Sequence, residues 1–166
     1  MKCLVADTGP LLHLHEAGAL HLLPLVGAVH VPEAVFSEAR TFAASLAGGG
    51  VPSWLTLHAL SPAAQERAQQ WQQASLLDTG EAAAVSLALE LKPNWLLTDD
   101  AAARLFAHTV GLEVHGSLGV VLWVAGQRLI PRAEAERLLA GLEQSSLWLA
   151  PRVREQARQA LDQLFE

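Results

Sequence analysis

The sequence has little cysteine and no long apolar run, and each shortage excludes a class of protein. Cys3 is the single cysteine among 166 residues, so no disulfide can form within the chain, and its apolar surroundings indicate an inert core residue. The chain reaches Asp7 before the apolar region of a signal peptide could develop. The longest apolar run, 118–125, is far shorter than the ~20 residues that span a bilayer. We therefore expect a soluble, cytoplasmic protein with no membrane segment.

Charged residues are also scarce, and basic ones are in the minority. Eleven Lys and Arg stand against 17 Asp and Glu, which gives a formal net charge of −6. Such a surplus argues against a general nucleic-acid binder, because phosphate contacts usually need a basic surface. However, the surplus lies within residues 1–100, which hold ten acids and four bases, whereas residues 101–166 hold seven of each. A bound cation would offset several of these acids, so the charge balance alone decides nothing.

Apolar residues are plentiful at 51% of the chain, which argues against disorder over most of its length. The length fits one compact domain, and no internal repeat or linker divides the sequence. We expect a single domain over residues 1–166, in which residues 132–166 form a C-terminal helical extension.

Short apolar runs alternate with longer helical patterns. The runs predict strands at 3–6, 28–31, 54–60, 95–98 and 112–114. Helices are predicted at 11–23 with an interruption at Gly18, at 33–47 up to the glycines 48–50, and at 62–74, 78–91, 101–110, 117–126, 132–143 and 151–165. This alternation favours an α/β fold with a parallel sheet covered by helices on both faces.

Acidic residues stand where such a sheet would bind a ligand. Right-handed crossovers place the carboxyl ends of all strands along one edge, which is the ligand-binding edge of open α/β sheets. Asp7 and the pair Asp99-Asp100 directly follow predicted strands, while Glu38 and Glu81 lie on predicted helices. These five acids are our candidate catalytic residues.

Each acid also has a structural interpretation. Asp7, or one member of the Asp99-Asp100 pair, can cap the helix that follows it. Glu81 stands three residues after Asp78, which is the spacing of a capping box, and Glu38 suits a solvated helix surface. A helix has one N-cap position, so capping leaves one member of the adjacent aspartate pair unexplained.

Electrostatics favours a cation if these acids converge. Two carboxylates ~4 Å apart repel by roughly 4 kcal/mol at an effective dielectric constant near 20. A hard divalent ion removes that cost, and a set of oxygen ligands selects Mg²⁺ or Mn²⁺ over zinc.

Four segments in series carry a resemblance to a known family. They are Val5-Ala6-Asp7-Thr8-Gly9-Pro10-Leu11-Leu12, Val31 to Glu38, Asp78-Thr79-Gly80-Glu81 with the apolar residues that follow, and Leu96-Leu97-Thr98-Asp99-Asp100. Over roughly residues 2–130 the chain resembles PIN domains, in a prokaryotic PIN-like branch related to VapC-type toxins.

The resemblance implies a three-layer α/β/α sandwich and a Mg²⁺- or Mn²⁺-dependent ribonuclease. It implies that Asp7, Glu81 and Asp100 bind the metal, with Glu38 as a further ligand or a neighbour of the ligands. Thr8 matches the hydroxyl residue that helps to hold such sites. The resemblance also implies an RNA substrate, a homodimer and an antitoxin protein as partner. Arg104, one turn beyond Asp100, is expected to contact substrate phosphate or to form a surface salt bridge.

Other functions remain to be weighed. A PIN-like protein that binds RNA or regulates without catalysis is the main alternative. A phospho-acceptor receiver domain needs an acidic pair after its first strand, where this chain has Asp7 alone, and no Gly-x-Gly-x-x-Gly follows a strand to bind a dinucleotide. His13 and His15 point to different faces of a helix, which disfavours a zinc site. The five tryptophans are expected to pack in the core or between helices.

Overall fold

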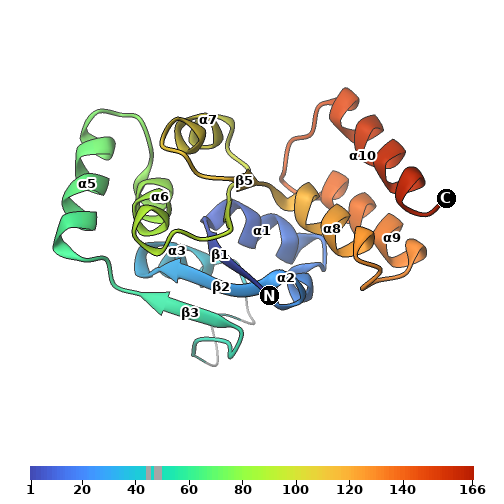
Figure 1. Ribbon diagram of the computed structural model, residues 1–166, viewed down its shortest axis with the longest axis horizontal. Helices are drawn as coiled ribbons and strands as arrows, with labels where there is room; N and C mark the ends of the chain where they lie inside the picture. The colour runs from blue at the N-terminus through green and yellow to red at the C-terminus, as the bar shows by residue number, and fades with distance from the viewer. Residues whose placement is uncertain (44–45, 47–49) are drawn as a thin grey trace.

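A computed structural model describes residues 1–43, 46 and 50–166 of the chain (Figure 1). Its strands form one parallel sheet in the order β3-β2-β1-β4-β5. The strands are β1 (Lys2–Ala6), β2 (Gly27–Pro32), β3 (Leu55–His58), β4 (Trp95–Leu97) and β5 (Val114–His115). Because β1 lies between β2 and β4, the strand order changes direction at β1, and a crevice forms beyond its carboxyl end.

Helices cover both faces of the sheet. They are α1 (Thr8–Glu16), α2 (Leu23–Val26), α3 (Glu33–Ala39), α5 (Pro62–Gln73), α6 (Thr79–Leu91), α7 (Ala101–Thr109), α8 (Ser117–Gly126), α9 (Arg132–Gln144) and α10 (Pro151–Leu164), with a 3₁₀ turn at Leu20–Leu22. Figure 1 shows α5, α6 and α7 on one side of the sheet and α1, α8 and α9 on the other. The C-terminal α10 packs on α8 and α9. This arrangement confirms the predicted three-layer α/β/α sandwich.

Several predicted elements have different bounds in the structure, and for two of them the local contacts give the reason. The helix expected over 33–47 ends at Ala39, because Thr41 bonds back to the carbonyl of Glu38 through both its N–H and its hydroxyl. The remainder of that prediction includes residues 44, 45 and 47–49, which lie outside the described residues. The strand expected at 112–114 is shifted to Val114–His115, because the N–H of Leu112 bonds to Ala107 at the end of α7.

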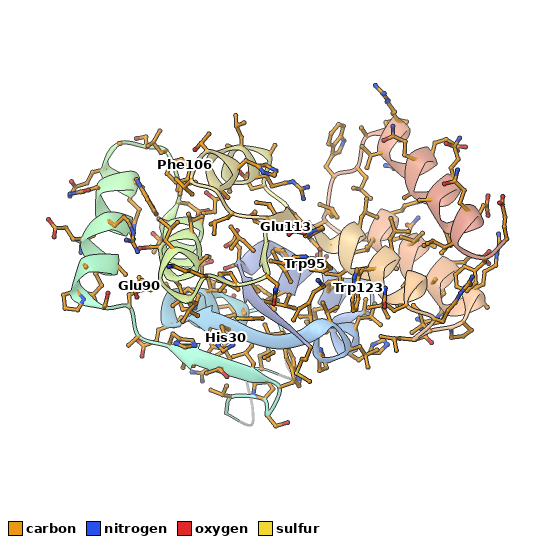
Figure 2. The ribbon with its side chains drawn as sticks, in the orientation of Figure 1. His30, Glu90, Trp95, Phe106, Glu113 and Trp123 are labelled. Atoms are coloured by element: carbon orange, nitrogen blue, oxygen red, sulfur yellow. The ribbon has the colours of Figure 1, made fainter. Side chains whose placement is uncertain are left out.

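The centre of the sheet is buried on both faces, which explains why its strands read as continuous apolar runs. Leu4, Val5, Leu96 and Leu97 are at most 1% exposed. Figure 2 shows Trp95 of β4 beside Trp123 of α8, and their rings meet edge-on with centroids 5.7 Å apart. In the described part of the chain, no helix has both the length and the apolar character to cross a membrane.

The composition of α6 sets the position of its N-terminus. Its buried run Ala82-Ala83-Ala84 consists of small residues, so the helix can approach the strands closely, and it contacts β1, β2 and β4. The first turn of α6 also meets α3, which in turn contacts α1. Three helix ends therefore surround the carboxyl end of β1.

Candidate active site

A cavity of about 590 Å³ lies at this carboxyl edge, and all five candidate acids line it. They come from different parts of the sequence, namely Asp7, Glu38, Glu81, Asp99 and Asp100. Asp78, Thr8 and His13 also line the cavity, and residues 146–150 form its opposite wall. The structure therefore brings the sequence-predicted acids to one place, as expected from the ends of parallel strands.

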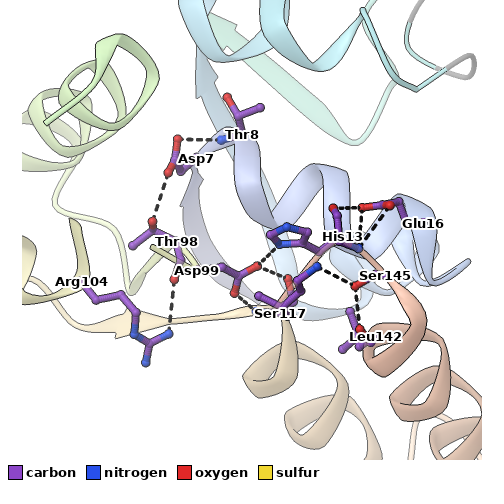
Figure 3. Close-up of polar contacts among 12 residues, drawn as sticks. Asp7, Thr8, His13, Glu16, Thr98, Asp99, Arg104, Ser117, Leu142 and Ser145 are labelled. Carbon is purple, nitrogen blue, oxygen red and sulfur yellow. Dashed lines mark hydrogen bonds and ion pairs between the residues drawn. The ribbon is translucent and has the colours of Figure 1, made fainter. Parts of the chain in front are cut away.

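Asp7 is the most buried acid of the cavity, with 6% of its surface exposed. One carboxylate oxygen accepts a hydrogen bond from the Thr8 N–H at 2.7 Å, and the other accepts one from the Thr98 hydroxyl at 3.1 Å (Figure 3). Burial raises the pKa of Asp7 to about 7, despite these two hydrogen bonds. The carboxylates of Glu81 and Asp78 raise it further. Asp7 caps α1 and also faces neighbouring negative charge, so the structural interpretation does not exclude the functional one.

Glu38 is held at the cavity by α1 and α6. The hydroxyl of Thr8 donates a short hydrogen bond to Oε2 of Glu38. Gly80 leaves the space that this carboxylate fills, since a Cβ atom there would stand 2.9 Å from Oε2 of Glu38 and 3.2 Å from Oγ1 of Thr8. Thr8 therefore orients Glu38 toward the first turn of α6.

Glu81 takes part in the capping box that its spacing from Asp78 predicted. The Glu81 N–H donates to Asp78 at 2.8 Å, and the Asp78 N–H donates to Oε2 of Glu81 at 3.0 Å. Burial raises the pKa of Glu81, against the effect of that second hydrogen bond. Three neighbouring carboxylates raise it further, those of Asp78, Asp100 and Glu38. Glu81 is thus both a capping residue and a member of a mutually repelling acidic group.

The adjacent aspartates have different surroundings. Asp99 accepts hydrogen bonds from the backbone N–H and the hydroxyl of Ser117, at 2.7 and 2.6 Å, and lies 2.7 Å from Nδ1 of His13 (Figure 3). Burial acts to raise the pKa of Asp99, but the hydrogen bonds from His13 and Ser117 outweigh burial and lower it. Both oxygens of Asp99 are occupied by this network, which joins β4 to α1 and α8.

The Asp100 carboxylate accepts fewer hydrogen bonds from the described residues than that of Asp99. Its Oδ1 accepts the Ala103 N–H at 2.8 Å and caps α7, and no hydrogen bond from the described residues reaches its Oδ2. Its charge contributes to the raised pKa of Glu81, and both carboxylates line the cavity. Asp100 therefore has an oxygen that accepts no hydrogen bond from the described residues, whereas Asp99 accepts three hydrogen bonds over its two oxygens.

Arg104 lies just outside the acidic cavity. Its Nη1 donates to the Thr98 carbonyl at 3.3 Å (Figure 3). No carboxylate of the described residues lies within 4.0 Å of its guanidinium, so the surface salt bridge considered from the sequence is not formed there. A side chain at Gly116 would come within 2.7 Å of Nη1 of Arg104 and 2.6 Å of Oδ1 of Asp99, so this glycine makes room for both groups.

The acids of the cavity are the right kind of ligand for a hard cation, but in the structure they do not stand close enough together to hold one. Over the described ranges, no three His, Cys, Asp or Glu side chains form a cluster close enough to hold a metal ion. Yet Asp7, Glu81 and Asp100 offer carboxylate oxygens, which are the donors that Mg²⁺ and Mn²⁺ prefer. Burial raises the pKa values of Asp7 and Glu81, and neighbouring carboxylates raise them further. A bound divalent cation would favour the charged forms of both side chains, so these residues are suited to hold one.

Some members of the site could not be recognised from the sequence. Thr98 and Asp78 adjoin predicted acids, and their position beside them was the only available signal. His13 and Ser117 lie 86 and 18 residues from Asp99, so their contacts with it depend on the tertiary fold. The wall formed by residues 146–150 gave no signal, because it lies outside the acidic motifs.

Comparison with known proteins identifies one family. The family model DUF3368, described as a PIN domain, matches residues 3–163. This match includes every residue that lines the cavity, all of α9, and all but one residue each of the sheet and of α10. No curated protein matches the chain.

Proposed function

The chain belongs to the PIN domain family, and from this membership we propose that it is a Mg²⁺- or Mn²⁺-dependent endoribonuclease whose active site is the acid-lined cavity. PIN domains are generally nucleases, act on nucleic acid and typically use divalent metal ions. One observation carries the assignment to this cavity. Acids that follow β1 and β4 line it together with acids of α3 and α6, and burial raises the pKa values of Asp7 and Glu81, with neighbouring carboxylates raising them further.

Asp7, Glu81 and Asp100 would hold the metal. A divalent ion held there would supply Lewis-acid chemistry, namely polarisation of a phosphoryl oxygen and a bound water whose pKa is low enough to give hydroxide near neutral pH. The hydrogen bonds from Thr8 and Thr98 keep the Asp7 carboxylate in one orientation at the floor of the cavity. No hydrogen bond from the described residues reaches Oε1 of Glu81, so this oxygen is free to orient a water for in-line attack on the phosphodiester.

The remaining acids support these three. Glu38, oriented by Thr8, faces the first turn of α6 and serves as a further ligand or as an acceptor for metal-bound water. Asp99 is a positioning residue. Its hydrogen bonds to His13 and Ser117 hold the backbone that carries Asp100.

The test is cleavage of single-stranded RNA by the purified protein with Mg²⁺, Mn²⁺ or EDTA, with single-stranded DNA of the same sequence as second substrate. We expect RNA cleavage that requires the metal and is lost in Asp7→Asn. Glu66→Gln is the matched control, because Glu66 is an exposed acid of α5 away from the cavity. RNA binding without cleavage at any metal concentration would favour the alternative, an inactive RNA-binding or regulatory PIN-like protein.

The resemblance to VapC-type toxins extends this proposal to a toxin that acts as a homodimer and is restrained by an antitoxin protein. Its test is the neighbouring open reading frame. A small DNA-binding protein encoded there, which forms a complex with this chain and stops cleavage, is the expected finding. An unrelated neighbour with no effect on cleavage would contradict the toxin role but not the nuclease.

A further inference from the structure

Trp148 differs from the other tryptophans of the chain. Its side chain is 79% exposed, whereas Trp95 is buried and Trp54, Trp71 and Trp123 pack against the core. The expectation that all five tryptophans are core or packing residues is therefore wrong for Trp148. A single exposed apolar side chain needs no explanation in itself, so what matters is where the Trp148 ring lies.

The segment that carries Trp148 is anchored on both sides. It connects α9 to α10 (Figure 1), and its neighbours Leu147 and Leu149 pack against the core or are buried. The Ser146 hydroxyl donates to Glu16 of α1, and Nε of Arg154 donates to the Leu149 carbonyl at 3.1 Å. Because the flanking leucines point inward, the alternation of an extended chain turns Trp148 outward. The ring is thus presented on a fixed backbone.

Trp148 stands between two cavities. It lines the acidic cavity, and it also lines a second cavity of about 460 Å³ that contains Arg104, His115 and Gly116. The two cavities share Asp99, Ala101, Leu147, Leu149 and Val153 in addition to Trp148. A ligand that occupies both cavities therefore passes along the exposed ring.

The two cavities differ in charge. The first holds the acids that suit a cation, whereas the second holds Arg104, whose guanidinium has no carboxylate within 4.0 Å in the described part of the chain. His115 in the second cavity is already paired with Glu113, at 2.8 Å. Acids that suit a cation, an exposed aromatic ring and an arginine are the kinds of group that bind a single nucleic-acid strand, in which phosphates alternate with bases.

We propose that Trp148 stacks on a base of single-stranded RNA next to the cleaved phosphodiester, and that Arg104 binds the adjacent phosphate in the second cavity. The inference rests on the proposed function, because it adds a base subsite and a phosphate subsite to the same active site. Stacking on an aromatic ring accepts any base, so these subsites confer a preference for single strands over duplexes and little sequence preference.

The experiment measures binding and cleavage in parallel. Binding of a fluorescein-labelled oligouridylate is followed by anisotropy in EDTA, in an Asp7→Asn background that prevents turnover, and KM is measured with Mn²⁺ in the wild-type background. Trp148→Ala is expected to weaken binding and raise KM by about tenfold, the range for loss of one stacked base, whereas Trp148→Phe keeps a ring and stays close to wild type. Arg104→Gln is expected to weaken binding and to reduce the slope of log K against log salt by about one.

Two control variants separate stacking from general surface effects. Leu105→Ala removes an apolar side chain that is 69% exposed and lines neither cavity, and Arg137→Gln removes an exposed arginine of α9. Both are expected to bind the oligonucleotide as the wild type does. Equal losses in these controls and in Trp148→Ala would overturn the inference.

The outcomes also separate this inference from the nuclease proposal. Metal-dependent cleavage with the same KM in wild type and Trp148→Ala would refute the stacking subsite and leave the nuclease standing. Trp148-dependent binding without cleavage would support the subsite and refute the nuclease. If Trp148→Ala changes the oligomeric state in sedimentation but not RNA binding, the ring belongs to a protein interface and the inference is wrong. Absence of RNA binding in every variant also refutes it.

Discussion

The hydroxyl of Thr98, at the end of β4, donates a 3.1 Å hydrogen bond to Oδ2 of Asp7, at the end of β1. Both residues are buried, and the two strands are paired in register just before them, with Ala6 opposite Leu97. This bond connects the two strand ends that supply the proposed metal ligands Asp7 and Asp100. The geometry of the proposed metal site therefore depends on a hydroxyl group that is not itself one of the proposed ligands.

Thr98→Val tests this dependence, because valine has the same shape as threonine but cannot donate a hydrogen bond. Loss of a bond to a carboxylate is expected to destabilise the ionised form by roughly 1–3 kcal/mol, which raises the pKa of Asp7 further. Mn²⁺ binding should weaken most below neutral pH, where metal and proton compete for Asp7. Calorimetric titration at pH 6 and pH 8 measures the effect, and an equal affinity for wild type and variant at pH 6 would contradict it.

The raised pKa of Asp7 predicts how the stability of the metal-free protein depends on pH. The folded protein keeps a proton on Asp7 up to about pH 7, whereas the unfolded chain releases it near 3.8. The free energy of unfolding should therefore fall as the pH rises from about 4 to about 7, by roughly 4 kcal/mol if the full difference is realised. Glu81 acts in the same direction, because its pKa is also raised.

Urea denaturation in EDTA across this pH window measures the effect. Asp7→Asn should show a smaller decline, because asparagine does not titrate, and saturating Mn²⁺ should reduce the decline in the wild type. A wild-type stability that rises between pH 4 and pH 7 in EDTA would show that Asp7 is not held as described.

The two adjacent aspartates should respond differently to alanine. Asp99→Ala removes the acceptor of three hydrogen bonds from His13 and Ser117, and we expect a loss of roughly 3 kcal/mol in the free energy of unfolding. Asp100→Ala removes a helix cap, which costs about 1 kcal/mol. Mn²⁺ affinity should show the reverse order, with the larger loss in Asp100→Ala. The opposite ranking in both measurements would assign the ligand to Asp99.

Gly80→Ala tests the packing of Glu38 against α6. The new methyl group would stand 2.9 Å from Oε2 of Glu38, so the carboxylate must move. Alanine is a better helix former than glycine by up to about 1 kcal/mol, so stability should change little while metal-dependent cleavage decreases. Gly126→Ala, which adds a methyl group at the end of α8 near the flexible side chain of Leu164, is the matched control. Full activity in Gly80→Ala would show that Glu38 has no part in the reaction.

The sequence was informative where a property is local. Apolar runs located the strands, and the parallel arrangement that follows from their alternation with helices placed Asp7 and the pair Asp99-Asp100 at one edge. The capping box of Asp78 and Glu81 depends on residues three apart, so their spacing predicted it. The spacing did not show whether a residue that caps α6 can also line the cavity. In the structure Glu81 does both.

Properties that depend on distant contacts were not accessible in this way. Nothing near Asp99 in the sequence indicates that His13 and Ser117 contact its oxygens, so only the resemblance to PIN domains favoured Asp100 over Asp99 as the ligand. Trp148 shows the same difficulty, since its exposure results from the anchoring of Leu147 and Leu149 in a core built by distant segments.

The most direct test of the central claim is Mn²⁺ binding to the isolated protein, measured by electron paramagnetic resonance at pH 8 for wild type, Asp7→Asn, Glu81→Gln, Asp100→Asn and the control Glu66→Gln. The account predicts saturable binding by the wild type and the control, and a loss of at least tenfold in affinity for each of the three site variants. Equal binding by all five proteins, or none by the wild type, would contradict a cation site built from these acids.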